Sequence, residues 1–550
     1  MKTNLLREKV LIALLILATS FSTLGQTVIT SDASGDWVSS TTWVGGVVPT
    51  SADNVIINNG HTVDIGATAS AEVASVIANG TLRVLSNNNN SGSLVFTGTI
   101  TGEITYRRRI SNIDYKIISS PTNTQNIKDF AEDSGNKIVS VTTGGTTKYA
   151  IGIYNNEAPA GSRWEYYSNP GSTGNPDIRF AGSFVSGHGY TMKRLSSGRY
   201  TFKGDVPSTN VSVNITTASG SHYWGALGNP YLAFLPANNN SNATSNLFSD
   251  NMAILSPNFQ ALYFWDGTQY VAVNNATAAY ELAPGQGFVA KVKSNNELFV
   301  FNKTSQTGQG AGYTFYRSIS TTPEIIVNLS NGTESRKTTI KYFADSTKGL
   351  DAGYDAGAYE DGVASFSIDT HLVNDSEGID FTLQCLPDNN YENIIVPLAV
   401  TAANGETLTF SAAVANLPSD INVYIEDLET NTITKINDGS YEVNLNSDIN
   451  GIGRFYMHTT NSNVLTTNEF ILQDVNLYKT STDHLRITGL QDQGTAKLTL
   501  YTITGREVFT HSFNAQRVHD VTVPSNLKTG FYLAQIVADN RKFVKKIIIE

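Results

Sequence analysis

The stretch LKTGFYLAQI (residues 527–536) places a glycine directly before an apolar strand. In two upstream stretches, LRITGL (485–490) and KLTLYT (497–502), apolar and polar residues alternate. This two-residue period is typical of a strand with one buried face. The basic and apolar run KKIII (545–549) follows, just before Glu550. The segment 477–550 is therefore predicted to form a small antiparallel β unit.

This series resembles the C-terminal sorting domain of the type IX secretion system, which is found on secreted proteins of the Bacteroidetes. The family pattern has three parts, an apolar strand with a glycine turn, a second turn before an aromatic strand, and a basic-then-apolar end. These parts match residues 500–508, 527–536 and 545–549. One departure is Tyr478-Lys479-Thr480-Ser481, where many members have a Tyr-Pro-Asn-Pro-like segment. The alternative is that this segment is a C-terminal β-sandwich that carries no sorting signal.

The resemblance implies export to the outer-membrane surface or the extracellular space. It also implies two partners, the type IX machinery and its sorting enzyme. The residues that would carry the sorting signal are Gly505, Leu527, Gly530, Tyr532, Lys545 and Lys546.

Residues 1–25 have the pattern of a secretory signal peptide, with a basic start, an apolar run and small residues before the cleavage site. Cleavage is expected between Gly25 and Gln26. The apolar run, 10–18, is about half as long as the ~20 residues that a membrane span requires. The alternative is that this segment is kept as a membrane anchor. No other stretch is apolar enough to predict a transmembrane segment.

The composition favours an all-β extracellular protein. Of the 550 residues, 15% are charged and 10% are aromatic, and the net charge is −11. Because there is no long basic run, we expect no nucleic-acid partner. Cys385 is the only cysteine, so no internal disulfide can form.

Short apolar runs separated by Asn, Gly and Ser turns fill residues 26–105. Examples are Val76-Ile77, Leu82–Val84 and Leu94–Phe96. This punctuation predicts the stacked coils of a short β-helix or roll. The stretch around Trp43 and His61 resembles an N-terminal module common in surface proteins of the same bacteria. We expect His61 to be a turn residue rather than a ligand.

Residues 106–313 contain an internal duplication of two β-rich halves, about 107–215 and 222–303. Four pairs of motifs recur in the same order. Each half contains a Gly-x-Gly turn before an aromatic residue, which indicates a tight turn because glycine tolerates positive φ. The paired motifs are YKIISSP (115–121) with WGALGNP (224–230), YNN (154–156) with WDG (265–267), GHGYTMK (187–193) with GQGFVAK (285–291), and YTF (200–202) with FVF (299–301).

Residues 314–460 contain seven short strand candidates, which is the number that a β-sandwich requires. This region resembles the immunoglobulin-like domain that often precedes the sorting domain in large Bacteroidetes surface proteins. A polar linker, 461–470, then leads to the tail, 471–550. The candidate strands are 325–329, 338–343, 381–384, 394–398, 408–410, 423–425 and 454–457.

No catalytic motif stands out, so we expect no enzyme and no cofactor. One candidate site is an acidic segment in which Asp345, Asp351, Asp355 and Asp361 would bind calcium through oxygen ligands, as an alternative to capping turns. A second candidate is a set of aromatic residues that would stack on sugars, as an alternative to core packing. These residues are Trp164, Tyr166 and Tyr167, or Trp265 and Tyr270.

The sequence therefore predicts an exported, cell-surface, multi-domain all-β protein without catalytic activity. Its predicted role is adhesion or the binding of glycans or matrix proteins. The alternatives are a secreted glycan-active enzyme, whose carboxylates one sequence cannot pair, and a purely structural spacer.

Overall fold

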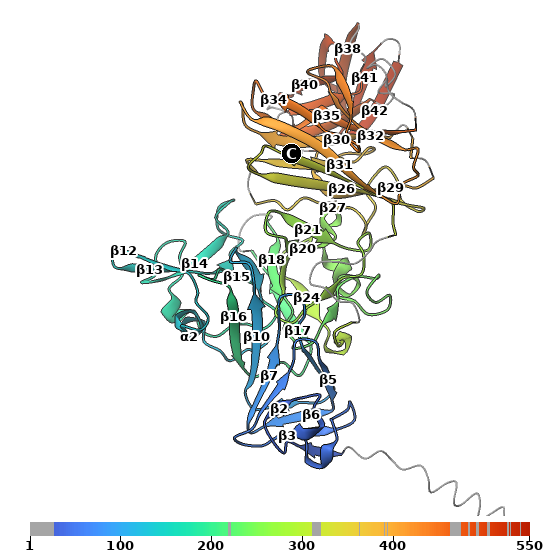
Figure 1. Cartoon of the computed structure of the whole chain (residues 1–550). Coiled ribbons are helices and arrows are strands. Elements are labelled where there is room, and N and C mark those ends of the chain that lie inside the picture. The colour runs from blue at the N-terminus through green and yellow to red at the C-terminus, as the bar shows by residue number, and fades with distance from the viewer. Residues whose placement is uncertain are drawn as a thin grey trace, which may run out of the picture.

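The protein is built from β-strands in successive regions that follow one another from the N-terminal module to the C-terminal tail (Figure 1). Among the residues placed in the structure, no helix has the length and apolar character needed to cross a membrane. The computed structural model describes residues 27–217, 222–310, 321–361, 364–389, 391–392, 394–461, 475–481, 484–490, 494–502, 506–524, 527, 530–538 and 541–549.

The N-terminal module is a β-solenoid, as the sequence predicts. Its strands pair in parallel from one coil to the next, and their buried residues alternate along each strand. The ring centroids of Trp37 and Trp43 lie 4.9 Å apart in its core, and Trp43 Nε1 donates a hydrogen bond to the Trp37 carbonyl. The three faces consist of β1 (Val28–Thr30), β3 (Asn54–Ile57), β6 (Ser75–Ala78) and β9 (Ile100–Thr101); β2 (Gly35–Asp36), β4 (Thr62–Ile65), β7 (Thr81–Leu85) and β10 (Ile104–Ile110); and β5 (Ser70–Val73) and β8 (Ser93–Phe96).

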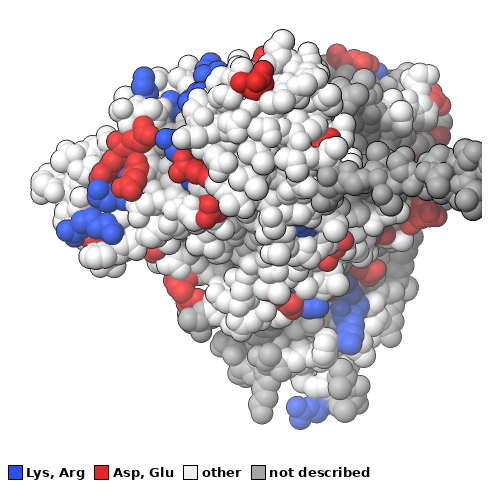
Figure 2. Space-filling model, turned by 90° about the horizontal axis from the view of Figure 1, so that it is seen from below, with Lys and Arg blue, Asp and Glu red and all other residues white. Residues whose placement is uncertain are grey.

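The end of the molecule that this module forms carries few charged side chains. In Figure 2, small acidic and basic groups lie beside one another on a largely uncharged face. The face in view has no broad basic surface. His61 lies in a turn here, with Nδ1 2.8 Å from Ser31 Oγ, as expected of a turn residue.

Strand β10 joins the solenoid to the duplicated unit. One edge pairs in parallel with β7, and the other edge pairs antiparallel with β16 (Gly198–Gly204). The boundary expected at residues 105 and 106 therefore lies inside a strand. Since β10 is hydrogen-bonded on both edges, the two regions share a sheet rather than a linker.

The two halves of the duplicated unit have the same strand order, as a duplication predicts. Each half has four strands paired antiparallel in the same order and, in addition, an antiparallel pair, β10 with β16 in one and β17 (Val211–Ile215) with β24 (Glu297–Phe301) in the other. β17 falls within the range predicted for the first half, but its partner strand belongs to the second. In the first half β12 (Ser140–Thr143) also pairs with β13. The corresponding sheets are β11 (Lys116–Ile118), β15 (Tyr190–Met192), β13 (Thr146–Tyr154), β14 (Trp164–Asn169), and β18 (Trp224–Gly228), β23 (Gly287–Lys291), β20 (Leu262–Trp265), β21 (Tyr270–Val273).

The two Gly-x-Gly turns connect the halves reciprocally. His188, in the turn of the first half, forms a bridge with Leu227 in β18 of the second half. Gln286, in the turn of the second half, forms a bridge with Ile118 in β11 of the first. Gly187 and Gly285 occupy equivalent positions with φ of 82° and 67°, which glycine adopts without strain.

The region from 321 to 461 is one eleven-stranded sheet that closes over a single hydrophobic core. All seven predicted strand segments lie in its strands. The sheet is continuous because β26 and β29 pair in parallel and connect its two ends. Its strands are β25 (Glu324–Ser330), β26 (Ser335–Phe343), β27 (Ala356–Gly357), β28 (Ser367–Thr370), β29 (Phe381–Pro387), β30 (Ile394–Ala402), β31 (Thr407–Ala415), β32 (Asn422–Asp427), β33 (Thr432–Lys435), β34 (Tyr441–Asn444) and β35 (Ile449–Thr460).

The tail forms two small antiparallel sheets around a core of its own, as its alternation predicts. It contacts the preceding region through Arg517, whose Nη1 donates to the buried Glu426 carboxylate at 2.9 Å. Glu426 also lies 2.9 Å from Nε2 of the buried His458. The sheets are β36 (Asn476–Ser481), β37 (His484–Thr488), β40 (Val518–Thr522), and β39 (Glu507–Asn514), β38 (Thr495–Thr502), β41 (Gly530–Ala538), β42 (Arg541–Ile549).

The segment 353–361 fastens the large sheet to the duplicated unit; we call it the clasp. Two of its acidic side chains form ion pairs with that unit: Asp361 pairs with Arg163, and the Lys291 ammonium lies 2.7 Å from the Glu360 carboxylate. The Tyr263 hydroxyl donates to the Gly357 carbonyl at 2.8 Å.

Tyr359 is the aromatic centre of the clasp. Its ring centroid lies 4.2 Å from that of Tyr270 and 4.8 Å from that of Trp224. Its hydroxyl lies 3.0 Å from that of Tyr154. Tyr359 therefore contacts strands from both halves of the duplicated unit at once.

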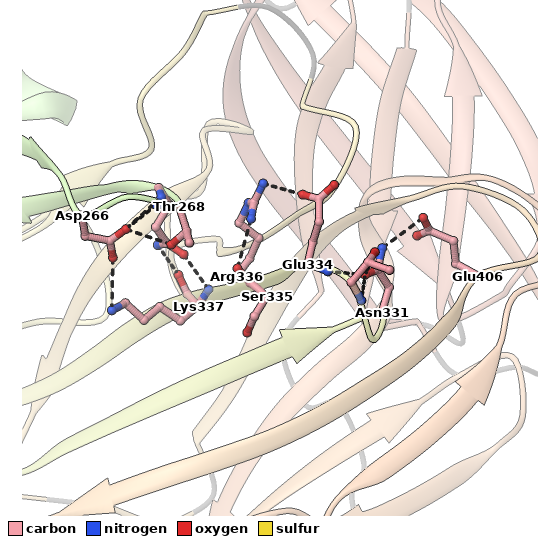
Figure 3. Close-up of polar contacts among 10 residues, drawn as sticks. Asp266, Thr268, Asn331, Glu334, Ser335, Arg336, Lys337 and Glu406 are labelled. Atoms are coloured by element: carbon pink, nitrogen blue, oxygen red, sulfur yellow. Dashed lines mark hydrogen bonds and ion pairs between the residues drawn. The ribbon is translucent and has the colours of Figure 1, made fainter. Parts of the chain in front are cut away.

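A second connection lies at the start of β26. The side-chain amide of Gln269 forms two hydrogen bonds with the backbone of Lys337, one donated and one accepted, each 2.8 Å long. The Lys337 ammonium points to Asp266, 3.5 Å away, as Figure 3 shows. Gln269 thus pairs with the free edge of a strand as a neighbouring peptide would.

We expect Tyr359→Ala to destabilise the junction by roughly 2–4 kcal/mol, because the truncation leaves a cavity among aromatic rings. Thermal melting and limited proteolysis between residues 310 and 361 measure this effect. Phe180→Ala is the matched control, because the Phe180 side chain is 83% exposed and surface changes of this kind stay within about 0.5 kcal/mol. Equal melting temperatures for the two variants would contradict the role given to the clasp.

Candidate functional site

The residues predicted to direct export lie at the two ends of the chain. Gly25, Gln26 and Gly505 are outside the described residues. Leu527 lies before β41, Gly530 begins that strand, and the Tyr532 side chain packs into the core of the tail. Lys545 Nζ donates hydrogen bonds to the Ser376 carbonyl and to Asn476, while Lys546 Nζ lies 4.1 Å from the ring centroid of Phe531.

The four aspartates of the predicted calcium site make different contacts. Asp345 is exposed in a turn, and Asp351 caps a turn by accepting hydrogen bonds from the backbone and hydroxyl of Thr347. Asp361 pairs with Arg163 in the clasp. Within the described ranges, no three His, Cys, Asp or Glu side chains gather as a metal ion requires. These contacts favour the turn-capping alternative for Asp351, and the calcium site stays a prediction.

Asp355 is buried and accepts two backbone hydrogen bonds, from Cys385 and from Asp351, each 2.6 Å long. Burial raises the pKa of this carboxyl to about 7, although the two N–H donors favour its charged form. Cys385 is itself buried, and burial raises the pKa of its thiol well above the usual value. The thiol is therefore a packing group rather than a nucleophile.

A cleft of about 760 Å³ lies between the duplicated unit and the large sheet. One wall is aromatic, and it includes four of the five residues that the sequence offered for sugar stacking. The fifth, Tyr167, is buried in the core of the first half. The aromatic wall consists of Tyr115, Trp164, Tyr166, Trp265, Tyr270 and Tyr359.

Neighbouring rings of this wall pack against one another in tilted or edge-to-face contacts. Tyr115 and Tyr166 lie 5.5 Å apart between centroids, and Trp265 and Tyr270 lie 5.2 Å apart. All are half-buried except Tyr115, which is more exposed. Because β14 and β21 occupy corresponding places in the two halves, the wall combines aromatic residues from both halves.

The facing wall is the polar face of the large sheet. Ser367 pairs with Thr401, and Thr401 pairs with Asn450, so their side chains share one face across β28, β30 and β35. Asp369 lies two residues after Ser367 and therefore on the same face. No sequence signal pointed to these residues, because β28 was not among the predicted strands and its neighbours across the sheet are distant in sequence.

Two carboxyl groups, those of Asp369 and Asp380, line this wall. Asp380 Oδ1 lies 2.7 Å from His371 Nε2. Burial, and then the charge of Asp380, raise the pKa of Asp369 well above its usual range. The cleft thus combines flat apolar rings with a few polar groups, which is the usual make-up of a small-ligand site.

Comparisons with known proteins cover nearly the whole described chain. A family model described as "Domain of unknown function (DUF8693)" matches residues 28–459, and one described as "Secretion system C-terminal sorting domain" matches residues 481–550. No curated protein matches the chain. A solved structure titled "Biofilm associated protein - BSP domain" aligns over 80% of this chain and 91% of its own, with 10% identity and a TM-score of 0.16, which is too low to carry an inference.

The raised pKa of Asp355 makes stability depend on pH. The proton is bound more tightly in the folded state than in the unfolded state, so the stability from this group is complete below about pH 4 and is lost as pH rises through about 7. Over this pH window, we expect the free energy of unfolding of the unmodified protein to fall by roughly 2–4 kcal/mol more than that of Asp355→Asn. Melting temperatures of both proteins, measured across the window, report this difference. Melting temperatures that change with pH by the same amount in the two proteins would contradict the raised pKa of Asp355.

Proposed function

Because the chain belongs to the family of the domain of unknown function DUF8693 and ends in a secretion system C-terminal sorting domain, we propose that it is a type IX surface protein that binds a glycan in its aromatic cleft. The sorting domain supports export to the cell surface or the extracellular space. The finer parts of the proposal are attachment to the outer membrane in a member of the Bacteroidetes, an immunoglobulin-like character of the region 314–460, and a role in adhesion.

The observation that carries the glycan-binding proposal is the pairing of the two walls of the cleft. Trp164, Tyr166, Trp265 and Tyr270 offer large rigid faces, and such faces contribute contact area at little conformational cost. The facing hydroxyl, amide and carboxyl groups can hydrogen-bond the hydroxyl groups of a sugar. A structural spacer would not require half-buried aromatic residues from two repeats to meet at one cleft.

A second candidate function, glycan hydrolysis, is favoured by the two carboxyl groups on one wall of the cleft. Asp369 and Asp380 have different surroundings, and two carboxyl groups beside the scissile bond serve as acid and base in glycosidases. Release of new reducing ends from a polysaccharide would support this candidate. Binding without release would support the non-catalytic role.

We expect Trp164→Ala to weaken glycan binding about tenfold, because a stacked aromatic residue contributes on the order of 1–2 kcal/mol. A panel of soluble oligosaccharides, titrated calorimetrically, provides the measurement. Phe180→Ala again serves as the control, since this exposed aromatic side chain lies outside the cleft. Equal affinities for both variants would argue against the aromatic wall as the binding surface.

Deletion of residues 477–550 should abolish surface display while leaving the rest of the chain folded. The tail has its own core, so its removal leaves the core of the large sheet intact. Surface labelling of intact cells and circular dichroism of the purified truncated protein test the two parts separately. Undiminished surface labelling would refute the sorting role, and an unfolded truncated chain would refute the independence of the two cores.

A further inference from the structure

We infer that the cleft selects glycans that carry a protonated amino group, and that the Asp369 carboxylate is the ion-pair partner of this group. This inference rests on the proposed glycan binding and names the class of sugar. Amino sugars with a free amine fit it, whereas their N-acetylated and acidic counterparts do not.

The first argument is the distribution of ionic partners around the cleft. Most of its charged side chains already have one: Asp361 pairs with Arg163, Glu360 with Lys291, and Arg336 with Glu334. Asp380 lies against His371. The described residues provide Asp369 with neither a hydrogen bond to its carboxyl group nor an ion pair. Asp369 is thus an acidic group of the cleft whose partner the protein does not supply.

The second argument is the position of Asp369. Thr370 pairs with Phe381, so Asp369 lies across from Thr382 and diagonal to Asp380 on the same face of the sheet. Diagonal neighbours of this kind lie about 7–8 Å apart between Cα atoms. A single ammonium group above Asp369 would therefore be attracted by both carboxyl groups. The aromatic wall on the other side leaves room for the sugar ring that bears this group.

The third argument is electrostatic. Burial and the charge of Asp380 raise the pKa of Asp369 because both disfavour a second negative charge there. An ammonium group stabilises that negative charge, and a carboxylate or sulfate group on a ligand would be repelled. Asp369 must release its proton to pair with the ammonium group, so affinity for the amino sugar should rise with pH as Asp369 ionises, for as long as the amino group of the sugar keeps its proton.

The other ionisable groups around the cleft do not replace Asp369 in this role. His371 neighbours Asp380 across the sheet, and Arg336 is held by Glu334 on β26. On the aromatic side, Lys116 interacts with the charges of Asp114 and Asp266, and burial lowers its pKa. Neither Ala399, which pairs with Asp369 on β30, nor Asn450 on β35 brings a charge.

The test compares three probes by titration calorimetry: a β-1,4-linked glucosamine oligomer, its N-acetylated counterpart and a glucose oligomer of equal length. We expect the unmodified full-length protein to bind the glucosamine oligomer about tenfold more tightly than the N-acetylated one. Asp369→Asn should reduce this preference to less than about threefold. Asp345→Asn, which removes an exposed carboxylate in a turn away from the cleft, should keep the preference.

Two further measurements keep the inference open to refutation if Asp369→Asn does not fold. The preference of the unmodified protein should rise and then fall with increasing pH, because Asp369 must lose its proton while the ammonium group must keep its own, and it should shrink at high salt because it is an ion-pair effect. Equal binding of all three oligomers would overturn the inference and leave glycan binding in place. Binding of none would overturn the proposed function, and stronger binding of a lysine-rich peptide than of any sugar would overturn both.

Discussion

The reciprocal bridges between the halves of the duplicated unit are the contact on which the rest of the structure depends. Each Gly-x-Gly turn lies against a strand of the other half, β18 at Leu227 in one case and β11 at Ile118 in the other. The backbones approach so closely that a Cβ atom at Gly189 would lie 2.7 Å from the Leu227 carbonyl oxygen. The two halves therefore form one body, and their aromatic residues meet in a single wall.

In the clasp, two aspartates that the sequence suggested for metal binding have contacts within the protein instead. Asp361 pairs with Arg163 of the duplicated unit, and the buried Asp355 accepts a hydrogen bond from the backbone of Cys385 in β29. Glu360 lies beside Lys291 of the same unit. Carboxylates with protein partners such as these fix the angle between two domains. They also place the polar face of the sheet opposite the aromatic wall, which forms the cleft.

The tail adds a third contact to the same sheet face. Tyr478 packs with Ala399 and Ile452, while Thr401 and Asn450 nearby on β30 and β35 line the cleft. The tail is thus a separately cored unit that nevertheless lies beside the proposed binding site. The buried Glu426, shared between His458 and Arg517, joins tail and sheet by charge as well as by packing.

The sequence alone determined those features that depend on local pattern. Alternation predicted the strands of the tail and the seven main strands of the large sheet, short punctuated runs predicted the solenoid, and paired motifs predicted two halves with one strand order. Each of these signals arises within a few residues or within one repeat, because a strand buries every second side chain and a glycine turn requires positive φ. The resemblance of the tail to the sorting domain likewise rests on motifs that are each only a few residues long.

Only the tertiary structure decided which residues form the site. It placed Trp164 and Tyr270 in a cleft but Tyr167 in a core, although all three are aromatic residues in similar strands. It also brought Asp369 to that cleft from a strand that the sequence did not reveal. Which side chains face one another across two domains depends on the register of distant strands and on the angle that the clasp fixes, and neither is encoded in the spacing of neighbouring residues.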